Sequence, residues 1–316
     1  MPTAPEPPPV VLIEGLTKRL RGVLAVDGLD LTVERGQVVG LAGPNGAGKS
    51  VTLKILLGLV RPTSGRVELF GEPARPGAPA LARVGALVDG PGFVPHLSGR
   101  VNLRLACRLA HLGDAELERA VANARLGPAI DRQYRTYSHG MRYRLGLAQA
   151  LLGQPELLIL DEPTTGLDPA HIREIRHAIA DAAAAGATVL FSSHVLREVE
   201  QVCTHAVVMQ QGRLVGAGRV EDLVHMTDTV RLETDRPDDA AEVLRATDGI
   251  TSVLVDDGAV EAQGPALRPG DLLLKLDAAG LAVQGFRRGR SLEEAYLELV
   301  GETAAESGPP EASPGP

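Results

Sequence analysis

With 316 residues, the chain has room for one large domain and a small one, and its hydrophobic content of 44% can fill a core that is mainly aliphatic. Its 32 basic residues against 40 acidic ones give a net charge of −8. This balance argues against a nucleic-acid-binding surface, which needs clustered positive charge. The sequence contains neither an apolar run of bilayer length nor a charged-then-apolar leader. We therefore expect a cytosolic protein unless a partner holds it at a membrane.

The first part of the chain reads as an α/β core interrupted by a helical block. Residues 1–9 are rich in proline and are expected to be disordered. The periodicity of residues 97–152 is helical with few strand signals, so this block is predicted as an insertion into the core. Strands are expected at 10–13, 29–33, 37–42, 66–70 and 84–88, with a helix over 51–60.

The remainder alternates strands with helices. Such alternation predicts a parallel α/β sheet with its ligand at the carboxyl ends of the strands. A second, smaller α+β domain of the split βαβ type is expected over 228–300, after a first domain over 10–225. Residues 301–316 are expected to be a disordered tail. The expected elements are strands at 157–160, 188–192, 205–210, 229–233, 250–255 and 259–263, and helices at 169–184, 195–202, 238–246 and 292–300.

A glycine-rich stretch, Gly43-Pro44-Asn45-Gly46-Ala47-Gly48-Lys49-Ser50, contains every fixed position of the G-x-x-x-x-G-K-[ST] loop. Its glycines let the backbone wrap closely around an anion, so that successive N–H groups and a helix N-terminus point at the β- and γ-phosphates. Lys49 adds positive charge at the same oxygens, and the Ser50 hydroxyl is a ligand for Mg²⁺. The stretch therefore predicts a nucleotide phosphate site.

Two acidic residues, Asp161 and Glu162, end the apolar strand 157–160. Asp161 would lie beside the phosphate loop, where a carboxylate can hold Mg²⁺. Glu162, one residue further on, can take a proton from an attacking water. The simpler alternative is an ordinary strand that ends in surface acids.

Three further stretches give the chain a resemblance to the ABC ATPase family. Tyr137-Ser138-His139-Gly140-Met141-Arg142 resembles the signature motif of that family. The stretch from Asp161 to Pro169, with Asp168 in it, resembles a Walker B strand that runs into a D-loop, and Ser192-Ser193-His194 resembles the switch-histidine segment. These motifs occur in the family's order over roughly residues 10–222.

The resemblance implies a RecA-like core with an antiparallel β subdomain and an inserted helical subdomain. It also implies that two copies close head to tail around ATP, so that Ser138 and the Gly140 N–H face the γ-phosphate held by the partner copy. His194 would bond the γ-phosphate and Glu162; on the residues alone, a helix-capping role for His194 stays open. Further expected contacts with the nucleotide come from Val26, Val51 and Asp168.

Several positions depart from the family pattern. Leu20 stands where an aromatic residue commonly stacks on adenine, so apolar contact with Val26 is expected to substitute. Tyr137 and His139 replace the usual leucine and glycine of the signature. Asp89 stands where a glutamine commonly contacts Mg²⁺, and is expected to be a metal ligand, although an ordinary turn residue is the alternative. The acidic residue at this position and the trailing small domain resemble drug-export ATPases of the bacitracin/daunorubicin type.

The resemblance therefore implies an ATP-hydrolysing subunit that uses ATP and Mg²⁺, pairs with a second copy, and drives a polytopic membrane permease from the cytoplasmic face, for export of a drug-like or lipophilic compound. One alternative is a non-transport ABC ATPase acting on DNA or ribosomes; another is a P-loop kinase or nucleotide switch. Two reduced, buried thiols are expected at Cys107 and Cys203. Surface or packing roles are expected for His96, His111, His171, His177, His205 and His225.

Overall fold

The computed structural model describes residues 7–225, 229–256, 258–264, 269–289 and 291–297. Contacts divide the chain into two compact units, residues 1–217 and 218–316, so the division falls before the boundary expected near residue 225. Of the segments expected to be disordered, residues 1–6 and 301–316 lie outside the described ranges, and residues 7–9 carry neither helix nor strand. Within these ranges, no helix has the length and apolar character needed to cross a bilayer.

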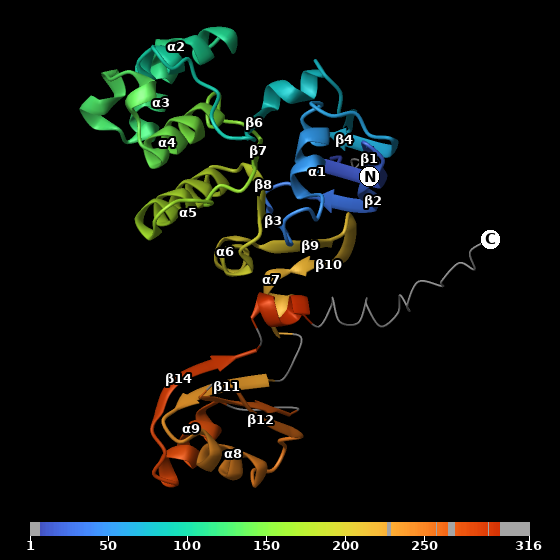
Figure 1. The fold of residues 1–316 in the computed structure, drawn as a ribbon, viewed down its shortest axis with the longest axis vertical. Helices are drawn as coiled ribbons and strands as arrows, with labels where there is room; N and C mark the ends of the chain where they lie inside the picture. The colour runs from blue at the N-terminus through green and yellow to red at the C-terminus, as the bar shows by residue number, and fades with distance from the viewer. Residues whose placement is uncertain (1–6, 226–228, 257, 265–268, 290, 298–316) are drawn as a thin grey trace, which may run out of the picture. The chain divides into compact units, whose positions relative to one another are not determined.

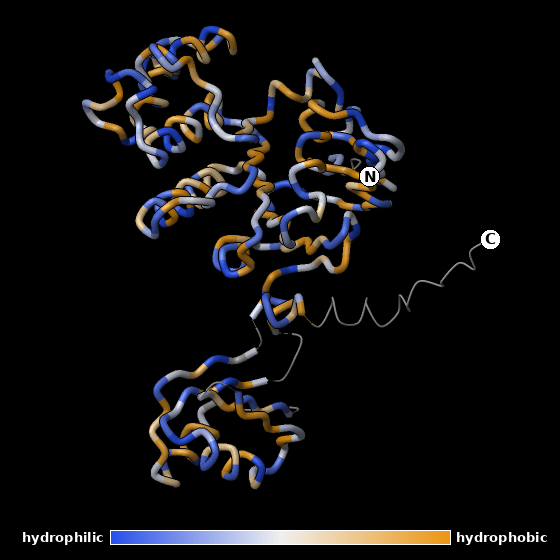
Figure 2. Tube along the Cα trace, viewed as in Figure 1, coloured by the Kyte–Doolittle hydropathy of each residue, from blue (hydrophilic) through white to orange (hydrophobic). Residues whose placement is uncertain are grey.

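A six-stranded sheet forms the centre of the first unit, in the order β10-β9-β3-β8-β7-β6. The neighbouring pairs from β9 to β6 are parallel, which confirms the α/β prediction. All residues of β3, β7 and β8 are buried, and these strands are predominantly apolar in Figure 2. Such continuous apolar runs are typical of parallel strands covered on both faces. The strands are β3 (Val38–Ala42), β6 (Val84–Leu87), β7 (Leu157–Leu160), β8 (Thr188–Ser193), β9 (His205–Gln210) and β10 (Arg213–Arg219).

A second sheet of the first unit is antiparallel, in the order β2-β1-β4-β5. Its strands are β1 (Val11–Leu20), β2 (Val23–Val33), β4 (Ser64–Leu69) and β5 (Glu72–Pro73). β1 and β2 pair over much longer stretches than the sequence predicted. The polar residues after Ile13 hid this extension, because pairing with β2 and β4 supports a strand that buries few of its side chains.

The expected helical block consists of α2 (Gly99–Leu109), α3 (Asp114–Ala124) and α4 (His139–Ala150), joined by the short 3-10 turns η2 (Gly127–Asp131) and η3 (Tyr134–Thr136). These helices gather on one side of the first unit and the antiparallel sheet lies on the other (Figure 1). The block has its own apolar core, which includes Leu103, Leu117 and Leu145. Ser98 and Ser138 cap the N-termini of α2 and α4 with their hydroxyls.

The remaining elements of the first unit are the short 3-10 turn η1 (Pro79–Arg83) and the helices α1 (Lys49–Leu56), α5 (Pro169–Ala184) and α6 (Leu196–Val202). α1 begins directly at the end of the glycine-rich loop that follows β3. α5 and α6 pack against β8. The carboxyl ends of β3, β7 and β8 therefore carry the loops that were predicted to bind phosphate and metal.

The second unit is an α+β domain with the order α7 (Val220–His225), β11 (Thr229–Thr234), α8 (Pro237–Arg245), β12 (Ser252–Asp256), β13 (Ala259–Gln263), α9 (Pro269–Ala278) and β14 (Val283–Arg288). Its sheet has the order β12-β13-β11-β14, and the paired strands are antiparallel. Because β13 lies between β11 and β12, the chain forms the split βαβ arrangement that the sequence predicted. Residues 292–297 are helical; the rest of the expected last helix lies outside the described residues.

Candidate active site

The glycine-rich loop between β3 and α1 has a backbone that only glycine accommodates at two positions. Gly43 has φ +146°, and a Cβ there would lie 2.2 Å from the Met209 carbonyl oxygen. Gly48 has φ +100°, and a Cβ there would lie 2.4 Å from the Ala25 carbonyl oxygen. A side chain at either position would collide with backbone, so the loop keeps a compact curve with its N–H groups free of side-chain cover. This is the form of a loop that cradles phosphate.

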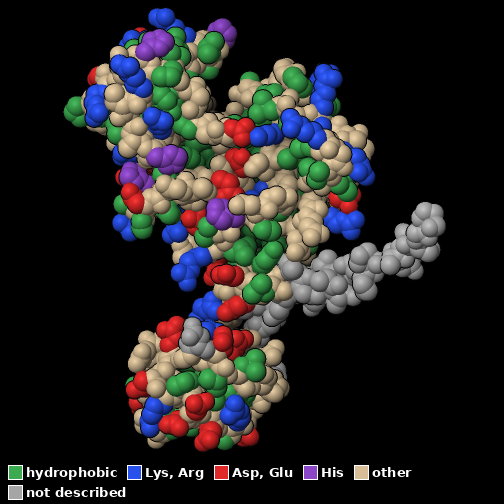
Figure 3. All heavy atoms as spheres, in the orientation of Figure 1, with side chains coloured by type: hydrophobic (Ala, Val, Ile, Leu, Met, Phe, Trp, Pro, Cys, Tyr) green, Lys and Arg blue, Asp and Glu red, His purple; other side chains and the backbone are tan. Residues whose placement is uncertain are grey.

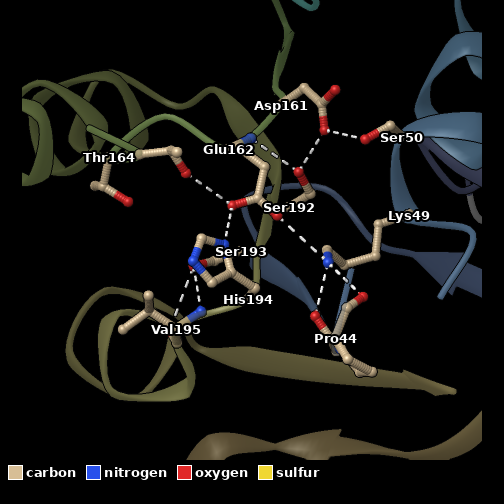
Figure 4. A network of polar contacts seen from close by, with 12 residues as sticks. Pro44, Lys49, Ser50, Asp161, Glu162, Thr164, Ser192, Ser193, His194 and Val195 are labelled. Atoms are coloured by element: carbon tan, nitrogen blue, oxygen red, sulfur yellow. Dashed lines mark hydrogen bonds and ion pairs between the residues drawn. The ribbon is translucent and has the colours of Figure 1, made fainter. Parts of the chain in front are cut away.

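Lys49, at the start of α1, is 4% exposed and is held at three oxygens. Its Nζ donates to the carbonyls of Gly43 (2.6 Å) and Pro44 (3.1 Å). The same Nζ lies 3.3 Å from Oε1 of Glu162. The lysine predicted on the phosphate loop and the acid predicted directly after β7 thus form an ion pair, in which Lys49 is buried and Glu162 is partly exposed (Figure 4).

Asp161, directly after β7, accepts two hydroxyl hydrogen bonds at the same oxygen. Ser50 Oγ donates to Asp161 Oδ1 at 2.9 Å, and Ser192 Oγ donates to it at 2.6 Å (Figure 4). The Ser192 Oγ in turn accepts from the Glu162 N–H at 2.9 Å. The two oxygens that were predicted to ligate Mg²⁺ are therefore neighbours, and hydroxyl and carboxylate oxygens are the donors that this ion prefers.

Glu162 lies at the centre of the site. His194 Nδ1 lies 2.6 Å from Glu162 Oε2, and Thr165 Oγ1 donates to the same oxygen at 3.1 Å. Burial alone would raise the pKa of Glu162, but the hydrogen bond from His194 and the charge of Lys49 outweigh it, so its pKa is lowered. The carboxylate is ionised, and the shared proton is therefore on His194 Nδ1. Glu162 also has φ +47°, an uncommon backbone for a non-glycine residue and one that clusters at functional sites.

His194 does not cap the helix that follows it. The N-cap of α6 is Val195, whose N–H donates to Ser193 Oγ at 3.0 Å. Ser193 Oγ in turn donates to Glu198 Oε2 at 3.3 Å, and Thr164 donates to the same oxygen. These bonds join the loop that contains Thr164 to the loop that contains Ser193. The His194 ring points toward Glu162 (Figure 4).

The residues of the signature segment lie apart from this cluster. Ser138 is exposed at the N-terminus of α4, where its Oγ accepts from Met141 N at 3.3 Å. Gly140 is buried in the first turn of the same helix. Asp168 caps α5 by accepting from the N–H groups of Ala170 and His171, both at 3.0 Å. Among the described residues, no hydrogen bond or ion pair joins Ser138 to the Lys49–Glu162 pair.

Comparison with known proteins agrees with the motifs and the fold. Residues 26–165 match the family model described as ABC transporter. An uncharacterized ABC transporter ATP-binding protein of Bacillus subtilis (strain 168) is 36% identical over 94% of this chain and 98% of its own. The chain belongs to the ABC transporter ATP-binding family. The bacitracin transport ATP-binding protein of Enterococcus faecalis is 34% identical over 92% of this chain and 96% of its own.

A solved ATP-binding subunit of an ABC transporter has the same fold, with a TM-score of 0.66 and 25% identity over 92% of this chain and 99% of its own. As an ABC ATP-binding subunit, the protein is an ATPase coupled to transport that works with a membrane permease. The resemblance stated from the motifs is thereby confirmed. The alternative of a P-loop kinase or nucleotide switch is wrong.

Two expected nucleotide contacts of this ABC subunit lie near the phosphate loop. Val26 is fully buried, with a methyl group 3.4 Å from the place of a Cβ on Gly48. Val51 is partly buried against the same core. Leu20, which stands in place of the stacking aromatic residue, is 39% exposed at the end of β1. Because Val26 has no exposed surface, its expected contact with adenine stays a prediction.

Asp89 is not brought to the metal oxygens of the ABC subunit. Its side chain is 67% exposed, and its Oδ1 lies 2.7 Å from Lys54 Nζ on α1. Its φ of +57°, followed by +79° at Gly90, is that of a tight turn. Among the described residues, no hydrogen bond or ion pair joins Asp89 to Ser50 or Asp161, and no cluster of three or more His, Cys, Asp or Glu side chains suits a metal.

The other expectations concern thiols and histidines. Cys107 is buried; Cys203 is partly exposed as a residue, but its Sγ packs against Gly40 of β3, 2.8 Å from the place of a Cβ there, and both cysteines are free. Burial raises the pKa of each thiol. His96, His111 and His177 are exposed, and His171 and His205 are partly buried; the side chain of His225 lies outside the described residues.

Sequence reasoning did not identify Ser192 and Thr165 as site residues of the ABC subunit. Ser192 joins Asp161 to the Glu162 backbone, and Thr165 donates to the Glu162 carboxylate. A signal for Ser192 existed, because β7 and β8 are parallel neighbours and pair Leu160 with Phe191. The next residue of each strand therefore lies side by side at the edge where the site forms.

Proposed function

We propose that the chain hydrolyses ATP in a pair with a second copy of itself and drives a separately encoded permease that exports an antibiotic or another lipophilic compound. The observation that carries the catalytic part is the continuous chain of contacts from Lys49 through Glu162 to His194 at the mouth of the phosphate loop. It brings a phosphate-binding cation, a carboxylate base and a histidine to one place. The three come from α1, the end of β7 and the end of β8.

The phosphate loop binds the β- and γ-phosphates of ATP through its N–H groups and Lys49. In the structure, the Lys49 Nζ donates to two carbonyl oxygens of the loop. In the complex with ATP, phosphate oxygens replace these carbonyls as its acceptors. Ser50 and Asp161 would hold Mg²⁺, because their neighbouring hydroxyl and carboxylate oxygens are of the kind that this ion prefers. When bound, this ion offsets the negative charge of the transferred phosphoryl group.

Glu162 accepts a proton from the attacking water. At the same time the water oxygen forms a bond to the γ-phosphorus, and the bond between that phosphorus and the ADP oxygen breaks. Its lowered pKa keeps it ionised at neutral pH, and the His194 Nδ1–H fixes the orientation of the carboxylate. With a second proton on Nε2, the imidazolium of His194 would also donate to a γ-phosphate oxygen. His194 thereby links the intact triphosphate to the position of the base.

A second copy completes the site. Ser138 and the N-terminus of α4 offer a hydroxyl and N–H groups of the kind that bind phosphate. No described contact brings them to the phosphate loop of the same chain. Two copies related by a two-fold axis would each present α4 to the nucleotide of the other, which makes hydrolysis depend on pairing.

The permease docks at the loop after β6 and on α2. Val94, Leu105 and Leu109 are exposed apolar residues here, with Leu109 84% exposed. Buried Asn102 ties this loop to α2, since its Oδ1 accepts from Val94 N at 2.8 Å and its Nδ2 donates to Val94 O at 3.2 Å. Acidic side chains lie between the helical block and the rest of the first unit in Figure 3, whereas α2 itself carries the exposed Arg104 and Arg108. The surface offered to the permease is therefore apolar and basic.

Export of a drug-like compound is supported by similarity along nearly the whole chain, second unit included, to a bacitracin transport ATP-binding protein. The residues described here form no substrate path of their own. Reconstitution with a candidate permease tests the class of transported compound. Bacitracin or a related lipophilic compound should stimulate ATP hydrolysis in proteoliposomes, and stimulation by DNA or ribosomes alone would favour the non-transport alternative.

Subunit mixing tests the paired site. Lys49→Ala damages the phosphate loop, and Ser138→Arg damages the surface offered to the partner. Each variant alone loses both sites of its homodimer, whereas a mixed pair keeps one intact combination. We expect each variant to be nearly inactive and the mixture to regain part of the wild-type rate. Normal hydrolysis by Ser138→Arg alone would overturn the role of Ser138 in the partner's site.

A further inference from the structure

His171 lies between two segments that the proposed function places at the interface of the pair. Its Nδ1 lies 2.8 Å from Asp168 Oδ2, and its backbone N–H donates to Asp168 Oδ1 at 3.0 Å. The backbone bond and then the side-chain bond from His171 lower the pKa of Asp168. The carboxylate is therefore an acceptor, and the Nδ1–H of His171 donates to it. Both bonds fix the ring relative to the loop that ends at Asp168.

The opposite edge of the same ring lies against the signature segment. A Cβ on Gly140 would come within 2.7 Å of the Cδ2 and Nε2 atoms of His171. Real Cβ atoms do not approach ring atoms so closely, so the imidazole occupies the space that a side chain at position 140 would need. Gly140 is buried in the first turn of α4. The imidazole is thus in contact with the backbone that presents the Gly140 N–H.

Two other contacts follow the same line between the helices. Arg144 Nη1 on α4 lies 3.7 Å from Glu174 Oε2 on α5. Arg144 follows Gly140 by four residues on α4, and Glu174 follows His171 by three residues on α5. Each therefore lies about one helical turn further along its helix. At the other end, a Cβ on Gly166 would lie 3.7 Å from His139 Nε2. α4 and α5 are therefore joined at His171 and at the Arg144–Glu174 ion pair, and His139 lies near Gly166 in the loop before α5.

We propose that His171 is a positioning residue that transmits the position of Asp168 to Gly140, and so sets the donor that the signature segment offers to the partner's γ-phosphate. Asp168 is exposed on the loop after the catalytic Glu162, where a partner copy can reach it. A shift of Asp168 moves the imidazole, and the imidazole moves the α4 N-terminus. This inference rests on the proposed pairing of two copies.

The role predicts a separation of binding from turnover. His171→Ala leaves the phosphate loop, Lys49 and Glu162 intact, so the affinity of the isolated chain for ATP should stay within about two-fold of the wild type. Because a small misplacement of a phosphate donor slows the reaction strongly, kcat should fall by about 10- to 100-fold. His177, an exposed histidine on the same helix, is the matched control. His177→Ala should leave kcat and ATP affinity unchanged.

A double-variant cycle tests the contact itself. Gly140→Ala alone should collide with the imidazole and lower kcat. His171→Ala makes room for the added methyl group, so Gly140→Ala/His171→Ala should be more active than Gly140→Ala. His171→Phe keeps the ring against Gly140 but removes the bond to Asp168, and should lower kcat without loss of melting temperature. This variant keeps the test decisive if His171→Ala is poorly folded.

Two outcomes would overturn the proposal: a normal kcat in His171→Ala and His171→Phe, or strictly additive losses in the double variant. The mixing experiment with Lys49→Ala and Ser138→Arg separates this failure from failure of the paired site. If mixing restores activity while the His171 variants turn over normally, the pair stands and the positioning role of His171 is wrong. If Ser138→Arg is fully active, the pairing on which both depend is wrong.

Discussion

Arg83 and Glu156 form a two-bond ion pair that joins the start of β6 to the start of β7. Arg83 Nε donates to Glu156 Oε1 at 2.6 Å, and Arg83 Nη2 donates to Oε2 at 2.8 Å. Arg35, in the turn before β3, donates to Oε2 at 2.7 Å. The bonds from Arg83 and then from Arg35 lower the pKa of Glu156 to about 2. One carboxylate thus ties together three segments that precede strands of the central sheet.

Because of these bonds to Glu156, we expect the free energy of unfolding to fall in acid. A carboxyl group whose pKa is lower in the folded protein stabilises the fold fully above its unfolded pKa of about 4.3, and loses that effect as the pH falls toward about 2. Because the Glu156 side chain is 42% exposed, solvent screening limits the effect, and Glu156→Gln should cost about 1 kcal/mol at pH 7. Urea unfolding at pH 7, 5, 4 and 3 should show the two proteins converging.

Glu34→Gln is the control for a general change in net charge, because Glu34 is exposed and lies next to Arg35 in the same turn. A difference for Glu156→Gln that is as large at pH 2.5 as at pH 7, or an equal effect of Glu34→Gln, would show that the ion pair is not the source. High salt should shrink the difference at pH 7.

Glu162→Gln tests the base. Glutamine keeps the size and much of the hydrogen bonding of glutamate but cannot accept a proton from water, so turnover should fall by roughly 10²-fold or more. ATP binding should persist, and the variant should accumulate as an ATP-bound dimer on a sizing column. Lys49→Ala is the comparison, because it should lose binding as well as turnover. Unchanged turnover in Glu162→Gln would refute the assignment.

The acidic residues and the glycine-rich loop of the candidate site could be located in the sequence because each lies in a short, contiguous stretch. The glycines, Lys49 and Ser50 occupy fixed spacings, and Asp161 and Glu162 follow an apolar run. Ser192 could not be found in this way, since a serine in a strand has no pattern of its own. Its role depends on the pairing of β7 with β8, which joins residues about 30 positions apart.

The fold shows the same division between local and long-range information. The helical block and the split βαβ unit have strong local periodicity and were predicted. The second half of β1 has polar residues and positive φ at Gly15, and it exists because β2 and β4 pair with it. His171 was expected to have only a surface or packing role. Its contact with Gly140 joins two helices that are separate in the sequence, so neither stretch contains a pattern that predicts it.

Tyr143 on α4 gives a stability prediction. It is 7% exposed, and its Oη is buried with no hydrogen-bond partner among the described residues. Burial and then the charge of Asp161 raise the pKa of this phenol well above its usual value. Because an unpaired buried hydroxyl is costly, Tyr143→Phe should raise the free energy of unfolding by about 1 kcal/mol. Chemical denaturation of the two proteins measures the change.

Tyr137 provides the matched control for this change. Its Oη donates to the carbonyls of Ala129 (2.8 Å) and Ile130 (3.1 Å), so Tyr137→Phe should lower stability by about 1 kcal/mol. Losses of similar size in both variants would mean that the Tyr143 hydroxyl does have a partner. A fall in kcat with unchanged stability would assign the hydroxyl to the neighbourhood of Asp161.

The last prediction concerns Asp89, which links the loop after β6 to α1 through Lys54. If this link couples the site to the permease, Asp89→Ala should lower permease-stimulated hydrolysis more than basal hydrolysis. Asp89→Gln should retain ATP binding and part of the coupled activity. Lys54→Met removes the same ion pair from the other side and should reproduce the coupling defect. The measurement is hydrolysis by the reconstituted complex, with and without permease, across a Mg²⁺ titration.

A role as a turn residue makes the opposite prediction. Asp89 has φ +57°, a conformation that Asn and Asp tolerate and that costs alanine roughly 1–2 kcal/mol. In that case Asp89→Ala should lose stability while Asp89→Asn does not, and the coupling ratio and Mg²⁺ dependence of both should match the wild type. Lys54→Met would then also couple normally, because the pair is exposed and contributes about 1 kcal/mol at most. A coupling defect shared by Asp89→Asn and Lys54→Met, at unchanged melting temperature, is the result that only the coupling role produces.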